Sequence, residues 1–210
     1  MEIIKRPASI KLMYWITIIG YWLFIVATLL ATVLSALMFL GVMENLQLQV
    51  GIPVIAELKE AGTLDSEFVP NLVNVELNDI TGRIQFLNTP VELARIYSVF
   101  MMIIMVLALY IFVTFKRFIT NVYNGIYFSP KNISQLKHIS YTVVLIWIFV
   151  VFYGYFQYFF IANNLVFDNI EFTSNVEIYP VILIFALVIW VLSHIFQKGS
   201  ELQEEQNLTV

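Results

Sequence analysis

Four long stretches of this sequence contain no Asp, Glu, Lys or Arg. A helix rises about 1.5 Å per residue and the hydrocarbon core of a bilayer is roughly 30 Å thick, so about 20 apolar residues cross it. Each stretch reaches that length, which predicts an all-α membrane protein built as a four-transmembrane-helix bundle. We place the spans, within a single integral membrane domain over residues 1–210, at about 13–42, 96–115, 139–162 and 178–197.

The composition agrees with a membrane protein, because only 12% of the residues are charged and 60% are hydrophobic. An ordinary soluble domain carries about 25% charged residues. The chain has no cysteine, which excludes disulfides, thiolate metal sites and cysteine nucleophiles. The first apolar stretch is far longer than the roughly 7–15 residues of a signal peptide. We therefore expect it to be retained as an anchor that tilts or projects beyond one face of the membrane.

The segment 116–138 fixes the expected orientation. It contains no acid and carries four basic residues: Lys116, Arg117, Lys131 and Lys137. Basic loops beside membrane spans stay on the cytoplasmic side. The segments 44–92 and 163–177 are acidic, so the charge alternates consistently at every crossing. We predict a cytoplasmic basic loop at 116–138, cytoplasmic termini with a tail at 199–210, and an extracytoplasmic acidic loop at 44–92.

Local patterns also predict where helices begin and end. Gly125 is expected to break the second helix, and Ser129-Pro130 to begin the third, because serine caps orphan amides and proline fits the first helical position. We expect the acidic residues of the tail to extend the fourth helix beyond the bilayer. In the first span, residues with small side chains predict a packing seam between helices: Thr17, Ala27, Thr28, Ala31, Thr32, Ser35 and Ala36.

The acidic loop 44–92 is expected to form β structure. Val73, Val75 and Leu77 alternate with polar residues, and Thr81-Gly82 predicts a turn into a second strand. Residues 54–61 fit a short helix. The segment 163–177 is expected to supply strand partners for that hairpin, which would give a small β-containing extracytoplasmic cap.

Two segments resemble a known family. The stretch Asn124–Ile133, followed by Leu136, resembles the loop after the second span in a bacterial group of small four-span membrane proteins, catalogued as domain of unknown function 2975. The closing Gly199–Val210 resembles the C-terminus of that family, and the span count agrees, so the resemblance covers most of the chain. It implies a multi-pass protein of the bacterial inner (cytoplasmic) membrane. Because members are often encoded beside a small helix-turn-helix regulator, it also implies a cytoplasmic partner of that kind.

Few residues are candidates for chemistry. His194 is the ionisable group inside a predicted span, and Gln157 lies in the third span near three tyrosines. Such side chains either line a polar cavity or lie at the membrane interface. With two distant histidines and no carboxylate in a span, we expect no catalytic, metal or cofactor site. There is no phosphate-binding glycine loop, and we expect no direct binding of nucleic acid.

These observations predict a non-enzymatic multi-pass membrane protein that acts as a regulator or sensor with a cytoplasmic partner. The expected contact residues combine the basic loop with the acidic tail: Tyr127, Phe128, Lys131, Lys137, Glu201, Glu204 and Glu205. The alternative is a transporter or channel subunit with a path between the spans. The basic loop alternatively binds anionic lipid or serves only to set the topology. The oligomeric state stays open, and a homo-oligomer in the lipid bilayer fits the sequence.

Overall fold

The computed structural model describes residues 7–42, 49–50, 54–66, 69–81, 84–86, 89–161, 164, 171–174 and 176–208. The chain divides into two compact units. A helical unit contains Met1–Met43, Val91–Phe149 and Tyr179–Val210, and a second unit contains Glu44–Pro90 and Val150–Ile178.

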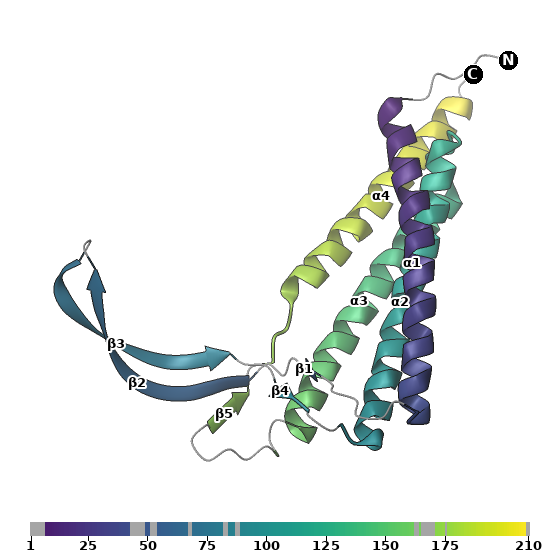
Figure 1. Cartoon of the computed structure of the whole chain (residues 1–210). Coiled ribbons are helices and arrows are strands. Elements are labelled where there is room, and N and C mark those ends of the chain that lie inside the picture. The colour runs from purple at the N-terminus through teal and green to yellow at the C-terminus, as the bar shows by residue number, and fades with distance from the viewer. Residues whose placement is uncertain are drawn as a thin grey trace. The chain divides into compact units, whose positions relative to one another are not determined.

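Four helices dominate the structure: α1 (Ala8–Leu40), α2 (Val91–Tyr123), α3 (Pro130–Phe160) and α4 (Pro180–Leu208) (Figure 1). All four are long and apolar enough to cross a membrane. This confirms the prediction of a four-helix, multi-pass membrane protein. The helices exceed the uncharged stretches because α2 and α3 continue through basic residues and α4 continues through most of the acidic tail. The expected extension of the fourth helix is therefore present.

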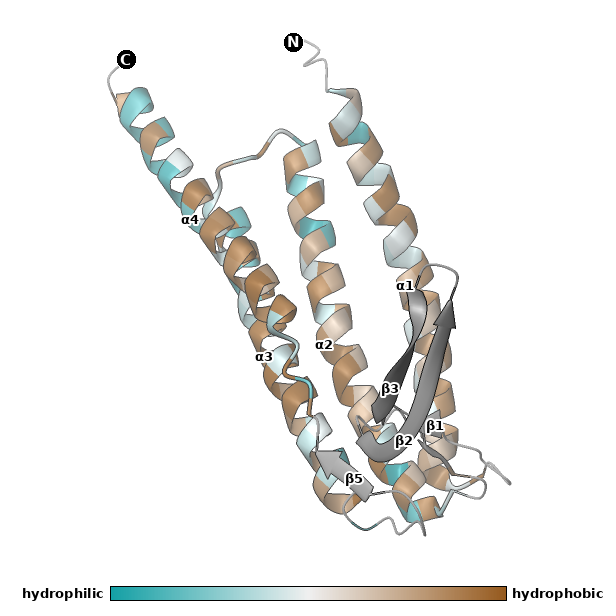
Figure 2. Cartoon of the chain, turned by 90° about the vertical axis from the view of Figure 1, so that its left-hand side faces the viewer, coloured by the Kyte–Doolittle hydropathy of each residue, from teal (hydrophilic) through white to brown (hydrophobic). Residues whose placement is uncertain are grey.

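The outer faces of the helices suit contact with lipid. Hydrophobic residues recur along all four helices (Figure 2). Leu23, Val106 and Phe185 each expose more than 60% of their surface, and many other large apolar side chains are similarly exposed. In water so large an apolar surface would drive association, whereas in a bilayer it contacts acyl chains at no such cost.

Helices α1 and α2 pack side by side through aromatic pairs. The rings of Tyr14 and Tyr123 stack with centroids 4.1 Å apart, and those of Phe24 and Phe112 stack at 4.2 Å. Of the predicted small-residue seam, Ser35 is the residue that is buried in α1. Three threonines instead donate to backbone carbonyls one turn earlier in α1, and each needs no partner from another helix: Thr17, Thr28 and Thr32.

Small residues join α3 to α4. The hydroxyl of Ser140 donates to the carbonyl of Ala186 over 2.8 Å, and both residues are buried. Ser193 lies two turns further along α4 and is fully buried. Small residues therefore also bring α3 and α4 together, in addition to the buried Ser35 of α1, because small side chains allow two backbones to approach closely enough for such a bond.

The second unit contains the strands β1 (Gln49–Val50), β2 (Val54–Ser66), β3 (Val69–Thr81), β4 (Ile84–Gln85) and β5 (Glu171–Ser174). β1 pairs with β4, and a second antiparallel sheet has the order β3-β2-β5. β3 covers the residues that were predicted as a strand, but the predicted pairing is wrong. β3 pairs with β2, with Thr63 opposite Asn74, and not with a strand after Thr81.

The short helix expected over residues 54–61 is also wrong, because these residues belong to β2. Their Ala, Glu, Leu and Lys content favours a helix, but pairing with a long antiparallel neighbour overrides local propensity. β5 pairs with β2, Val54 lying opposite Ser174, and not with the strand at 73–77. The expected strand residues Val166 and Phe167, the turn residue Gly82, and Asn88 lie outside the described residues.

Candidate functional site

Three parts of the helical unit lie at the same end: the start of α1, the turn between α2 and α3, and the last turns of α4 (Figure 1). Tyr14 near the start of α1 stacks on Tyr123 at the end of α2. The rings of Phe128 in the turn and Phe196 in α4 lie 5.4 Å apart. The basic loop and the tail, which are distant in sequence, therefore build one surface.

Gly125 ends α2 as predicted. Its φ of +83° lies in the left-handed region that glycine adopts without a steric penalty. Its N–H donates to the carbonyl of Val122, and the N–H of Ile126 donates to that of Asn121, each over 3.0 Å. This pair of bonds is the Schellman arrangement, which satisfies carbonyls that the helix end leaves without partners.

Ser129 and Pro130 begin α3, also as predicted. Pro130 is the first helical residue, and the Ser129 hydroxyl accepts the N–H of Asn132 over 3.2 Å. A serine in this position satisfies one of the orphan donors of the first turn. Local interactions therefore end α2 and begin α3 within a few residues of each other.

Asn132 holds the turn together, a role that was not predicted from the sequence. Its side chain is fully buried. Its amide nitrogen donates to the carbonyls of Ile126 and Tyr127 over 2.7 and 2.8 Å, and its oxygen accepts from the amide of Asn121 over 2.8 Å. The available signal was an amide residue three positions after a serine cap. The motif that carried the family resemblance is thus the set of residues that shapes this turn.

Phe128 connects the turn to α4. Its ring lies beside Phe196, and a Cβ added at Gly199 would approach that ring within 2.6 Å. The absence of a side chain at Gly199 therefore lets the turn lie against α4. A groove of about 700 Å³ runs along this contact, and we call it the turn–tail groove; it is lined by Gly125, Ile126, Tyr127, Phe128, Gly199, Leu202, Gln203 and Gln206.

The structure brings some predicted partner-binding residues together and separates others. Tyr127 and Phe128 line the turn–tail groove. Lys137 donates to the side-chain oxygen of Gln197 over 3.2 Å, which ties α3 to α4. Lys131 lies in a different groove. Glu204 and Glu205 are exposed on the last turns of α4.

Glu201 pairs with Lys198 within α4 at 2.6 Å. The hydrogen bond and the charge of Glu201 raise the pKa of Lys198. The hydrogen bonds from Lys198 and Gln197, with the charge of Lys198, lower the pKa of Glu201. Both side chains are solvent-exposed, and exposed ion pairs contribute little to stability because water and salt screen them.

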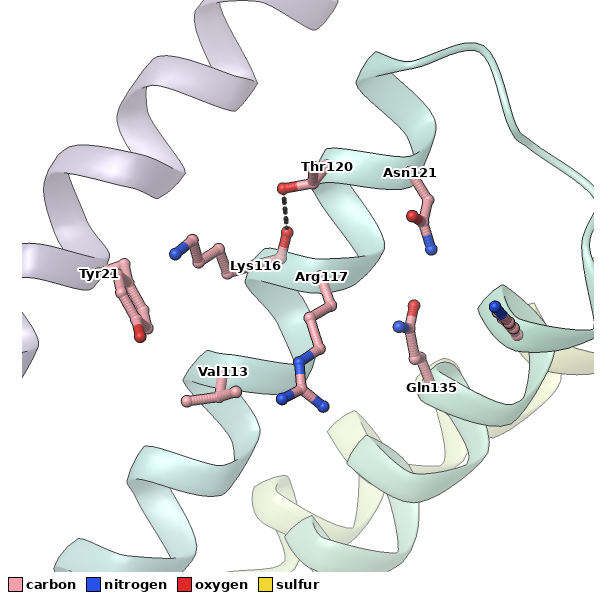
Figure 3. A pocket seen from close by; sticks show the side chains of 8 residues that line it. Tyr21, Val113, Lys116, Arg117, Thr120, Asn121 and Gln135 are labelled. Atoms are coloured by element: carbon pink, nitrogen blue, oxygen red, sulfur yellow. Dashed lines mark hydrogen bonds between the residues drawn. The ribbon is translucent and has the colours of Figure 1, made fainter.

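A second groove, of about 500 Å³, lies between α1, α2 and α3. Figure 3 shows Lys116 extending toward Tyr21 of α1, and Arg117 lying on the side of Gln135. We call this the cationic groove because three of its lining residues are bases; the full set is Tyr21, Val113, Lys116, Arg117, Thr120, Asn121, Lys131 and Gln135.

The two predicted polar residues of the spans lie elsewhere. His194 is exposed on α4, and its ring packs edge-on against Trp190 at 4.3 Å. Gln157 is buried in α3, with 3% of its surface exposed. Neither residue lines either groove. A role for them in a polar path stays a prediction.

Comparison with known proteins finds a family but no characterised relative. No curated protein and no solved structure matches the chain. A family described as protein of unknown function (DUF2975) matches residues 60–210, which include α2, α3 and α4 and therefore both of the helix ends that form the turn. Since the match covers more than half of the sequence, the chain belongs to the DUF2975 family.

Proposed function

We propose that this protein is a non-enzymatic regulator of the bacterial inner membrane that binds a cytoplasmic protein in the turn–tail groove. The observation that supports this proposal most directly is the groove itself. The groove is formed by the α2–α3 turn and the last turns of α4, and both segments lie outside the uncharged apolar stretches.

The proposed orientation places this end of the helices in the cytoplasm. Lys116, Arg117, Lys131 and Lys137 belong to α2 and α3 near the turn, and no acid lies between Glu92 and Asp168. Basic residues beside spans are retained inside the cell. The acidic loop with strands β2 and β3 would then form an extracytoplasmic cap, which would supply the signal.

The groove has the chemistry of a protein contact. Ile126, Tyr127 and Phe128 each expose between 42% and 49% of their surface, and Leu202 exposes 60%. Exposed aromatic and aliphatic side chains outside the bilayer are typical of interaction sites, and aromatic residues are enriched at their centres. Glu204 and Glu205 are exposed on the same last turns of α4, outside the lining of the groove.

A basic partner would complement that charge. Proteins that bind DNA carry basic surfaces, so the small helix-turn-helix regulator implied by the family resemblance could contact the apolar groove together with the exposed acids of the same tail. Capture of such a regulator at the membrane would keep it from its operator, and release would follow from a change in the spans or the cap.

Site-specific photocrosslinking in cells tests this proposal. A photoreactive amino acid replaces Gln203 or Tyr127, which line the groove, and Leu187 provides the control because it is exposed on the apolar part of α4. We expect the first two positions to crosslink a small soluble DNA-binding protein and Leu187 to crosslink none. The proposal fails if positions 203 and 127 capture the same products as position 187.

A deletion provides the second measurement. Removing residues 199–210 takes away the α4 side of the groove, so the partner should no longer co-purify with the membrane protein. Retention of every partner after that deletion, combined with Lys131→Gln and Lys137→Gln, would contradict docking at this end.

A further inference from the structure

The cationic groove is a site of a different kind from the turn–tail groove. It lies between three helices, and Lys116, Arg117 and Lys131 line it. The structure describes one ion pair, between Lys198 and Glu201, so within the described part of the chain no carboxylate pairs with any of these three bases. The Lys116 ammonium lies 3.8 Å from the centroid of the Tyr21 ring, a cation–π contact that holds it toward α1.

Like charges in one groove repel, and the helix ends add to the effect. Lys131 lies in the first turn of α3, where the helix dipole is positive and disfavours a cation. No acid occupies that first turn to compensate it. An anion bound between Arg117 and Lys131 would relieve both sources of repulsion.

The depth of the groove indicates where that anion comes from. Tyr14 and Tyr123 stack near the end of the helices, and Tyr21 and Lys116 each lie seven residues deeper along α1 and α2. Seven residues are two helical turns, or about 10 Å. The uncharged stretch of α2 ends at Phe115, immediately before Lys116. The groove therefore lies where apolar surface gives way to polar surface, which is the level of lipid headgroups.

Gln135 adds a second requirement on the ligand. Its side-chain oxygen is buried and has no hydrogen-bond partner among the described residues. A buried acceptor without a partner costs free energy, so a ligand that brings a donor is favoured. Its amide lies toward Arg117 and Asn121 in the groove (Figure 3).

We propose that the cationic groove binds an anionic phospholipid whose headgroup carries a hydroxyl. Arg117 and Lys131 hold the phosphodiester, and the headgroup hydroxyl donates to the oxygen of Gln135. Phosphatidylglycerol has both groups and serves as the probe. This site is independent of the proposed cytoplasmic partner, and it places a lipid between α1, α2 and α3 at the end where the turn is formed.

Native mass spectrometry of the full chain in detergent, titrated with phosphatidylglycerol, measures the binding. Arg117→Gln with Lys131→Gln removes two charges from the groove, and both side chains are exposed, so the fold is expected to persist. The control, Lys137→Gln with Lys198→Gln, removes the same charge at the same end from residues that do not line the groove. We expect affinity to fall roughly 25-fold in the first pair and by less than about threefold in the control.

The headgroup hydroxyl is tested with phosphatidylmethanol, which has the same charge and no hydroxyl. The natural sequence should prefer phosphatidylglycerol about fivefold, and Gln135→Leu should abolish that preference without reducing binding of phosphatidylmethanol. If the two double variants lose lipid affinity equally, the lipid is attracted by the basic surface in general, and the proposed site is wrong. If inorganic phosphate at equal concentration displaces the lipid, the groove binds free phosphate, and the proposal of a lipid ligand is wrong.

Discussion

At the scale of single residues, Asn132 shows how one side chain can hold a turn together. One buried side chain satisfies two carbonyls of the turn and the amide of Asn121. Asn132→Ala leaves these groups without the partner that the fold provides. We expect a loss of about 2 kcal/mol in the free energy of unfolding, measured by denaturant titration in micelles with circular dichroism.

Two further variants separate this effect from a general effect of mutation in the turn. Asn124→Ala makes the same chemical change at an exposed position, and we expect less than about 0.5 kcal/mol there. Asn132→Asp keeps the acceptor for Asn121 but places one carboxylate oxygen against two carbonyls, so it should cost at least as much as alanine. A stable Asn132→Asp protein would show that the two carbonyls do not depend on Asn132.

The residues at the helix ends were predictable to different degrees. Gly125 and Ser129-Pro130 were found from sequence because a left-handed glycine and a serine cap act on backbone within a few positions. Asn132 was not found, because its partners at positions 121, 126 and 127 come together only after the turn has closed. The basic loop was considered as a contact for anionic lipid from the sequence, but the groove itself was not predicted for the same reason: Tyr21, which closes it on the side of α1, is far from Lys116 in the sequence.

At the scale of elements, small residues allow α3 and α4 to pack closely. Ser140→Ala removes the interhelical bond to Ala186, and such bonds in membranes contribute about 0.6 kcal/mol on average. Ala186→Leu adds volume at a position that is 2% exposed, so it should cost about 1–3 kcal/mol. Unfolding in mixed micelles measures both.

Comparing the losses of stability in Ser140→Ala and Ala186→Leu shows what holds the contact between α3 and α4. Leu187→Ala is the matched control, because Leu187 is the next residue on α4 and exposes 57% of its surface. We expect its effect to be smaller than that of Ala186→Leu. If Ser140→Ala proves the more costly change of the pair, the hydrogen bond and not the close approach of the helices holds this contact.

The elements themselves were predictable only where their cause is local. Each span was visible because twenty consecutive apolar residues suffice to cross a bilayer, whatever the rest of the chain does. The faces that pack were not visible, since small residues occur in several spans and only the position of a neighbour selects Ser140 and Ala186. The prediction of strand pairing failed for a similar reason. The local sequence at the start of β2 favours a helix, and pairing with β3 makes it a strand.

At the scale of the whole molecule, the number of membrane crossings determines which parts of the helical unit share an end. The beginning of α1, the α2–α3 turn and the last turns of α4 share one end, which requires an even number of passes between them (Figure 1). Both grooves lie toward this end. A single orientation therefore decides whether both grooves face the cytoplasm.

The cysteine-free chain allows that orientation to be measured directly. Gln203→Cys lies in the exposed part of α4, and Asp65→Cys lies in β2. We expect an impermeant maleimide applied to intact cells to label position 65 and to label position 203 only after permeabilisation. The reverse pattern would place the basic end outside and would contradict docking of a cytoplasmic protein.

The cause of the orientation is tested by changing charge at that same end. Replacing Lys116, Arg117, Lys131 and Lys137 by glutamine removes the basic bias, so a fraction of molecules should expose position 203 to the reagent. Replacing Glu201, Glu204 and Glu205 by glutamine alters charge at the same end, but acids contribute little to topology, so the labelling should not change. If the acidic variant inverts as readily as the basic one, net charge and not retention of Lys and Arg sets the direction in which this chain crosses the membrane.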